Sequence, residues 1–141
     1  MFRRKKFNEQ NSRGVAALEV ALAMPAMLMT LFGTVEFGRA FVIRQTLANA
    51  AAEAARVGSA ASCPRATEGE VKEAAYIMLA SSGLMPSLAT VTVDNAGGTS
   101  GTDVVVDISY DVQLPVLSKL ISMLTDSEGI ELTARVDAEN E

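Results

Sequence analysis

The chain has 141 residues, 49% of them apolar, which is enough for one small domain and a membrane anchor. It has no histidine, and Cys63 is its only cysteine. Thiol pairs within the chain, the common zinc ligand sets and Ser-His or Cys-His catalytic pairs are therefore excluded. We expect a protein that is not an enzyme and that needs no cofactor, metal ion or small-molecule substrate.

Charge divides the chain into a basic start and an acidic remainder. Residues 1–14 carry five basic and one acidic side chain, a net charge of +4, and the rest carries seven basic and sixteen acidic, a net charge of −9. The body thus lacks a basic face for nucleic acid. A short basic segment before an apolar run is typical of the cytoplasmic flank of a membrane helix. This predicts a cytoplasmic N-terminus and a periplasmic location for residues 57–141.

The apolar run covers residues 15–35, which is long enough for a helix to cross about 30 Å of hydrocarbon. Glu19 is its one charged member. Residues 36–57 are amphipathic, and no strong helix breaker follows until Gly58. We expect a single helix from about Val15 to about Arg56, with one face of its amphipathic part made of Phe37, Phe41, Arg44, Leu47 or Ala48, Ala51 and Ala55.

Residues 58–66 are small and polar and include a proline, which predicts a linker before a domain at 67–141. A second helix is expected over residues 68–82. Thr67 is placed to cap its first turn while Glu70 bonds back, and Gly83 is placed to end it. Its apolar stripe is Val71, Ala74, Ala75, Met78 and Leu79.

After this helix the apolar period changes to two. Val91 and Val93, then Val104 to Val112 beyond an NAGGTSG turn, predict a hairpin with one solvated face that carries Asp103, Asp107 and Asp111. Residues 130–137 alternate in the same way and predict a third strand, while Leu117, Leu120, Ile121 and Leu124 take helical spacing. The predicted class is α+β and pilin-like: a long N-terminal helix, a three-stranded antiparallel sheet and short covering helices.

Arg13, Gly14 and Glu19 form the most informative group. A basic leader ends in a glycine, the apolar run begins at once, and a lone glutamate stands five residues past the glycine. A prepilin peptidase needs this layout, because a residue without a side chain lets the backbone enter a protease cleft at the membrane surface. Cleavage after Gly14 would make Val15 the new N-terminus.

Glu19 would then be the fifth residue of the mature chain. A carboxylate inside the apolar run costs roughly 2.5 kcal/mol or more unless it has a partner. The new amino group of a neighbouring subunit's Val15 is one such partner, and this pair would set the stagger between subunits. The alternative is that Glu19 lies at the level of the lipid headgroups and is solvated.

The segment RGVAALEVALAMPAMLMTLFGTVEFGRAFVIRQTLANAAAEAARVG, residues 13–58, resembles the N-terminal signature of TadE-like pseudopilins of the tight-adherence, or Flp, pilus system. The most specific parts are Gly14 with Glu19, Pro25, Phe32-Gly33, the cluster from Glu36 to Arg39 and the alanine-rich tract after Gln45. The resemblance implies processing by a prepilin peptidase and a minor pilin or assembly role in a pilus used for adhesion. Its expected partners are the peptidase, other pilus subunits, assembly-platform proteins and inner-membrane lipid.

Two other functions stay open on the sequence. Residues 1 to about 35 could be an ordinary secretory signal that exports a soluble acidic binding domain, although Glu19 interrupts the apolar core that such a signal needs. The chain could also be an anchored scaffold of a pilus or secretion platform that never enters a filament. Glu36, Arg39 and Arg44, just past the apolar run, suit either interfacial anchoring or contacts between subunits.

Overall fold

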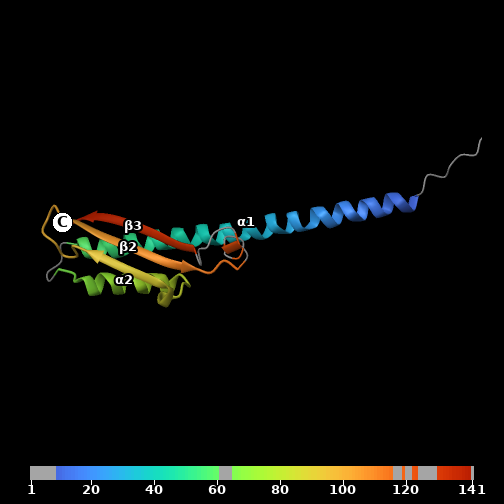
Figure 1. Cartoon of the computed structure of the whole chain (residues 1–141). Coiled ribbons are helices and arrows are strands. Elements are labelled where there is room, and N and C mark those ends of the chain that lie inside the picture. The colour runs from blue at the N-terminus through green and yellow to red at the C-terminus, as the bar shows by residue number, and fades with distance from the viewer. Residues whose placement is uncertain (1–8, 61–64, 116–118, 120–121, 124–129, 141) are drawn as a thin grey trace, which may run out of the picture. The chain divides into compact units, whose positions relative to one another are not determined.

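The structure, a computed structural model, describes residues 9–60, 65–115, 119, 122–123 and 130–140, with side chains from Gly14 onward. Its elements in chain order are helix α1 (Glu9–Ser59), helix α2 (Glu68–Ser81), the 3-10 turn η1 (Pro86–Leu88), and strands β1 (Ala89–Asp94), β2 (Asp103–Val112) and β3 (Ile130–Glu139) (Figure 1). The predicted α+β class is confirmed. The helical spacing of Leu117, Leu120, Ile121 and Leu124 lies outside the described residues.

The chain divides into two compact units, Met1–Val35 and Glu36–Glu141, and α1 supplies residues to both. Helix α1 is continuous, as expected, but it begins at Glu9 rather than near Val15. The physical reason is that residues 9–13 contain no proline and that Gly14 alone costs a helix only about 1 kcal/mol. The second half of α1 is part of the globular unit.

The sheet has the order β1-β2-β3, with both pairs antiparallel. Its register is uninterrupted: Val91 pairs with Ile108, and Ile108 pairs with Ala134. The inward residues of β2 are all buried: Val104, Val106, Ile108, Tyr110 and Val112. The residues between them are exposed or half-buried, so the predicted hairpin with one solvated face is confirmed.

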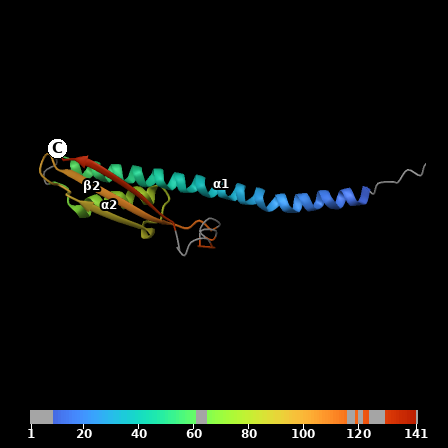
Figure 2. The same cartoon turned by 45° about the horizontal axis from the view of Figure 1, so that its top comes forward.

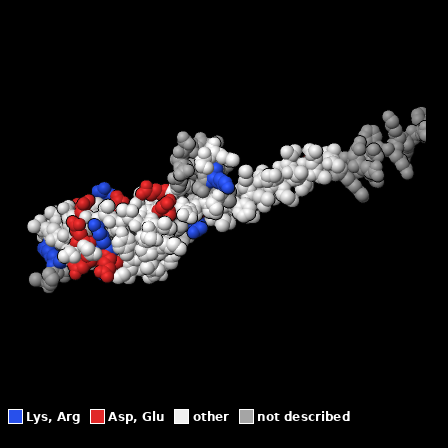
Figure 3. Space-filling model, turned by 60° about the horizontal axis from the view of Figure 1, so that its bottom comes forward, with Lys and Arg blue, Asp and Glu red and all other residues white. Residues whose placement is uncertain are grey.

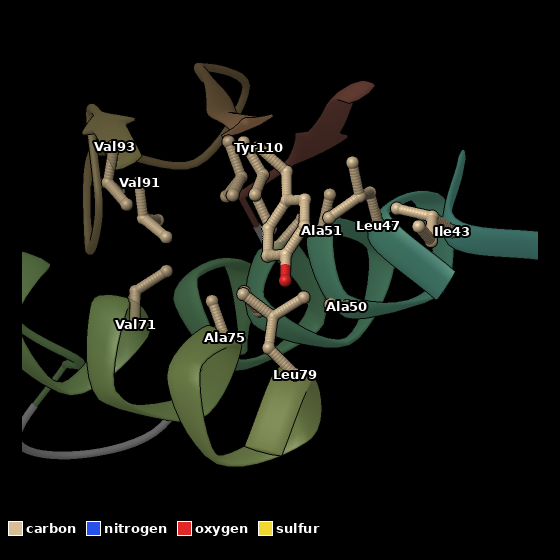
Figure 4. Packing of buried hydrophobic residues seen from close by; sticks show 14 of the residues in the cluster. Ile43, Leu47, Ala50, Ala51, Val71, Ala75, Leu79, Val91, Val93 and Tyr110 are labelled. Carbon is tan, nitrogen blue, oxygen red and sulfur yellow. The ribbon is translucent and has the colours of Figure 1, made fainter. Parts of the chain in front are cut away.

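Helix α2 and the second half of α1 cover the same face of the sheet (Figures 1 and 2). The close view shows Leu47 and Ala51 of α1 and Leu79 of α2 gathered around the ring of Tyr110 (Figure 4). Leu47, Leu79 and Ile108 are fully buried, and each such side chain contributes about 1.5–3 kcal/mol of transfer free energy.

The predicted face of α1 in this unit is partly wrong. Leu47, Ala51 and Ala55 are buried as expected, but Phe37 and Phe41 are exposed, and so is Arg44. The buried face instead contains Ile43, Leu47, Ala50, Ala51, Ala54 and Ala55. A face that included Arg44 would have carried an ionised guanidinium into an apolar core, which is costly without a partner. The small alanines let α1 approach the sheet closely.

The ends of α2 are as predicted, because the signals are local. The Thr67 side chain accepts a bond from the Glu70 N–H, and the Thr67 N–H donates to the Glu70 carboxylate at 2.8 Å. This backbone bond, together with the Thr67 hydroxyl, lowers the pKa of Glu70. At the other end, Gly83 has φ +80° and the Leu84 N–H donates to the Leu79 carbonyl, which closes a Schellman motif.

At Gly58, α1 lies close against the core. A Cβ at this position would lie 3.0 Å from Val104 Cγ1 and 3.1 Å from Val71 Cγ2, whereas a Cβ at Gly38 would meet nothing within 4 Å. Gly58→Leu is therefore expected to lower the free energy of unfolding by about 1–3 kcal/mol through overpacking. Gly38→Leu is the matched control, and denaturant unfolding of the full chain in detergent should leave its stability unchanged or raised. Equal stability of the two variants would contradict this packing.

Candidate membrane anchor and processing site

The candidate site is the first unit of the chain, where α1 presents apolar side chains all round. Within the described residues, α1 from Gly14 onward is long and apolar enough to span a membrane, with a mean hydropathy of 2.0 over 18 residues. None of that window is buried within the chain. On the face shown in Figure 3, the apolar segment carries no Lys, Arg, Asp or Glu colour, whereas charged side chains gather on the second unit. Exposed large apolar side chains continue along it: Val15, Leu18, Val20, Leu22, Met24, Met27, Leu28, Met29, Leu31, Phe32 and Val35.

The polar hydroxyls of this segment are satisfied by the helix itself. Thr30 Oγ1 donates to the Ala26 carbonyl at 2.9 Å, and Thr34 Oγ1 donates to the Thr30 carbonyl at 2.8 Å. Such bonds to the residue four earlier are what a hydroxyl needs where no water is available. Pro25 stands inside the helix and removes one backbone donor. The surface of residues 20–35 is thus suited to lipid.

Glu19 is exposed on this helix. Within the part of the chain that the structure describes, it has no hydrogen bond or ion pair, so a single copy of these residues supplies no counter-charge. Val15, one helical turn earlier, is also exposed. Residues at this spacing lie on the same side of a helix. The structure therefore brings Val15 and Glu19 onto one outward side, where a neighbouring molecule could reach both.

Gly14 lies within α1. A Cβ added there would meet nothing within 4 Å. The chain's own packing thus does not require a glycine at this position. A glycine inside a helix lowers its local stability by about 1 kcal/mol relative to alanine, which makes local unwinding around residues 13–15 easier. Such unwinding would help a peptidase that binds its substrate in an extended conformation.

The residues just past the apolar run differ in environment. Glu36 is buried, at 8% exposure, and it has an interaction partner. Arg39 and Arg44 are exposed. From the sequence these three residues were grouped as one interfacial cluster, and the burial of Glu36 was missed. The signal that could have revealed it is the successive spacing of seven, four and three residues from Glu36 through Ile43 and Leu47 to Ala50, which is that of one helix face.

Comparison with known proteins gives one family. Residues 14–56 match the family model described as TadE-like protein. No curated protein and no solved structure matches the chain. The matched segment begins at Gly14, covers the apolar run and reaches the last turns of α1. It therefore includes Gly14, Val15, Glu19 and the apolar run, and none of the sheet.

Proposed function

Because residues 14–56 are TadE-like, we propose that the chain is a membrane-anchored minor pilin or pseudopilin that takes part in assembling a pilus of the tight-adherence type. Residues 15–35 are the anchor, and the second unit is the part displayed outside the membrane. Its role is to bind other subunits rather than to catalyse a reaction.

The observation that carries this proposal is the contrast between the two units. The second unit has a closed apolar core of helix and sheet side chains, while the first exposes about 31 Å of apolar helix, taking 1.5 Å for each of residues 15–35. A helix that is apolar all round needs a dry environment, either lipid or the interior of an assembly. The proposed subunit would be surrounded by lipid before assembly and by other subunits after it.

We further propose that a prepilin peptidase cuts after Gly14 and that the new Val15 amino group pairs with Glu19 of an adjacent subunit. The exposure of Val15 and Glu19 on one side of the helix supports this pairing. A buried charge pair of this kind fixes one register, since any other register leaves an unpaired charge in a dry place. The net charge of +4 in residues 1–14 supports an orientation with the N-terminus in the cytoplasm.

Deletion and complementation test this function. A strain that lacks the chain should assemble few or no pili, because a subunit needed for their assembly would be missing. The full chain should restore them. Residues 36–141 exported behind an ordinary cleavable signal should not, because the anchor is gone.

Pili counted by electron microscopy and surface attachment are the readouts. Normal pili in the deletion strain would contradict the pilus role. Restoration by the soluble residues 36–141 would contradict the anchor and favour the exported binding domain.

A further inference from the structure

Strand β3 forms one edge of the sheet. It has ten residues, and its register with β2 is continuous from the pair Val112 and Ile130 to the pair Asp103 and Glu139. In the sheet order β2 is its one neighbour, and among the described residues no backbone bond from outside the sheet reaches it. About half of its N–H and C=O groups therefore point away from β2, where another strand could pair with them.

The shape of β3 does not protect this edge. Edge strands are commonly protected by being short, by proline or by a bulge. Strand β3 contains no proline or glycine, and no bulge interrupts its pairing with β2. The opposite edge, β1, has only six residues and follows the turn that begins at Pro86. Of the two edges, β3 is thus the longer and more regular template for an added strand.

The inward side chains of β3 are apolar and only half-buried, and they form one row: Ile130, Leu132, Ala134, Val136 and Ala138. The corresponding row of β2 is buried. The row of β3 therefore still exposes apolar surface. An added strand with apolar residues at every second position would cover that surface, because alternate side chains of a strand point to the same face.

The outward side chains determine which charge such a strand should carry. Acidic residues predominate on this face of β2 and β3: Asp103, Asp107, Asp111, Glu131, Asp137 and Glu139. Arg135 is the one basic residue of the two strands. Asp111 lies directly opposite Glu131, and like charges in such a position destabilise a sheet. Lysine or arginine on an adjacent strand would reduce this repulsion, whereas acidic residues would add to it.

We propose that β3 binds an extended segment of another protein, which joins the sheet as a further strand. The segment alternates apolar residues, which cover the half-buried row, with lysine or arginine residues, which face the acidic side chains. Main-chain hydrogen bonds to β3 supply the affinity, and the alternation supplies the specificity. This inference rests on the second unit alone and requires no removal of the leader.

A second copy of the chain does not match this edge. Its β3 would bring the same three acidic residues and single arginine, a net charge of −2. Its β1 has Asp94 as its one charged residue. Neither edge strand of a second copy therefore supplies the basic residues that the acidic face favours.

The test is the binding of designed peptides to the full chain in an uncharged detergent, measured by fluorescence anisotropy and corrected for binding to empty micelles. The probe alternates valine and lysine over about ten residues, the length of β3. One control peptide has every backbone amide N-methylated, which removes its donors and keeps its side chains. Another has glutamate in place of lysine. We expect the probe to bind roughly tenfold more tightly than either control.

Hydrogen exchange and one pair of variants locate the bound peptide. The amides of residues 131–139 should gain protection, and those of β1 should not. Asp137→Asn should weaken binding roughly threefold, as the loss of one exposed ion pair predicts. Asp94→Asn is the matched control, because Asp94 and Asp137 both pair with Val105, from opposite sides of β2. Its binding should equal that of the wild type.

Equal binding of the N-methylated peptide, or protection of β1 in place of β3, would overturn the proposal. A dimer of the full chain with protected β3 amides and no peptide would also overturn it, since a second copy would then occupy the edge. Circular dichroism verifies that both variants remain folded. The pilus count in the deletion strain tests the proposed function separately, so the two can fail independently.

Discussion

Gly14→Leu is expected to leave the leader attached to the chain. A side chain at the residue before the cut must be accommodated in a peptidase cleft shaped for glycine, and overpacking of this kind costs about 1–3 kcal/mol, or roughly a 5- to 150-fold slower cut. Leucine also strengthens the helix that has to unwind there. The processed fraction, measured by gel shift and mass spectrometry, should fall accordingly.

Gly33→Leu provides the control for this variant. Gly33 lies in the same helix, and a Cβ there also meets nothing within 4 Å. Both variants therefore leave the chain's own packing unchanged, and only the one at position 14 should accumulate as the uncut form. Normal processing of Gly14→Leu would refute the proposed cleavage site.

Glu19→Gln is expected to abolish pilus assembly while the chain still enters the membrane. Removing a charge from the apolar run lowers its transfer cost, so insertion should be equal or better. The amino group of the adjacent Val15 would lose its counter-charge, and breaking one side of a buried pair costs about 3–5 kcal/mol. That corresponds to a loss of roughly a hundredfold or more in subunit association.

The measurement compares membrane level, leader removal, pilus number and co-purification with other pilus subunits between Glu19→Gln and the wild type. Equal membrane levels and cleavage have to be established first. If pilus number and co-purification then stay at the wild-type level, Glu19 is a solvated residue at the membrane surface and does not set the register.

Local signals predicted the fold well. Thr67 and Glu70 are three residues apart, and a capping box needs nothing else, so the start of α2 was found correctly. The alternation of Val104 to Val112 determined which face of β2 is buried. The sequence does not show which side of α1 faces the core, because both sides of the helix carry apolar residues. Only packing against the sheet decides that Ile43 turns inward and Phe41 outward.

The candidate site and the packing of the second unit differ in how far they could be predicted from the sequence. Gly14, Val15 and Glu19 lie within six residues, so their spacing on one helix was predictable. The position of Arg39 near Tyr110 was not predictable, because the two residues are 71 positions apart and are brought together only by tertiary packing. Arg39 was recognised as interfacial, but nothing in its neighbourhood along the chain indicated Tyr110 as a companion.

The mass and N-terminal sequence of the membrane-bound form test whether this chain is held in the membrane by a helix whose leader has been removed. We expect the loss of residues 1–14 and a mature chain that begins at Val15 and stays in the membrane fraction. Removal of about thirty residues or more, with the remainder recovered as a soluble protein, is the outcome of an ordinary secretory signal and would refute the proposed anchor.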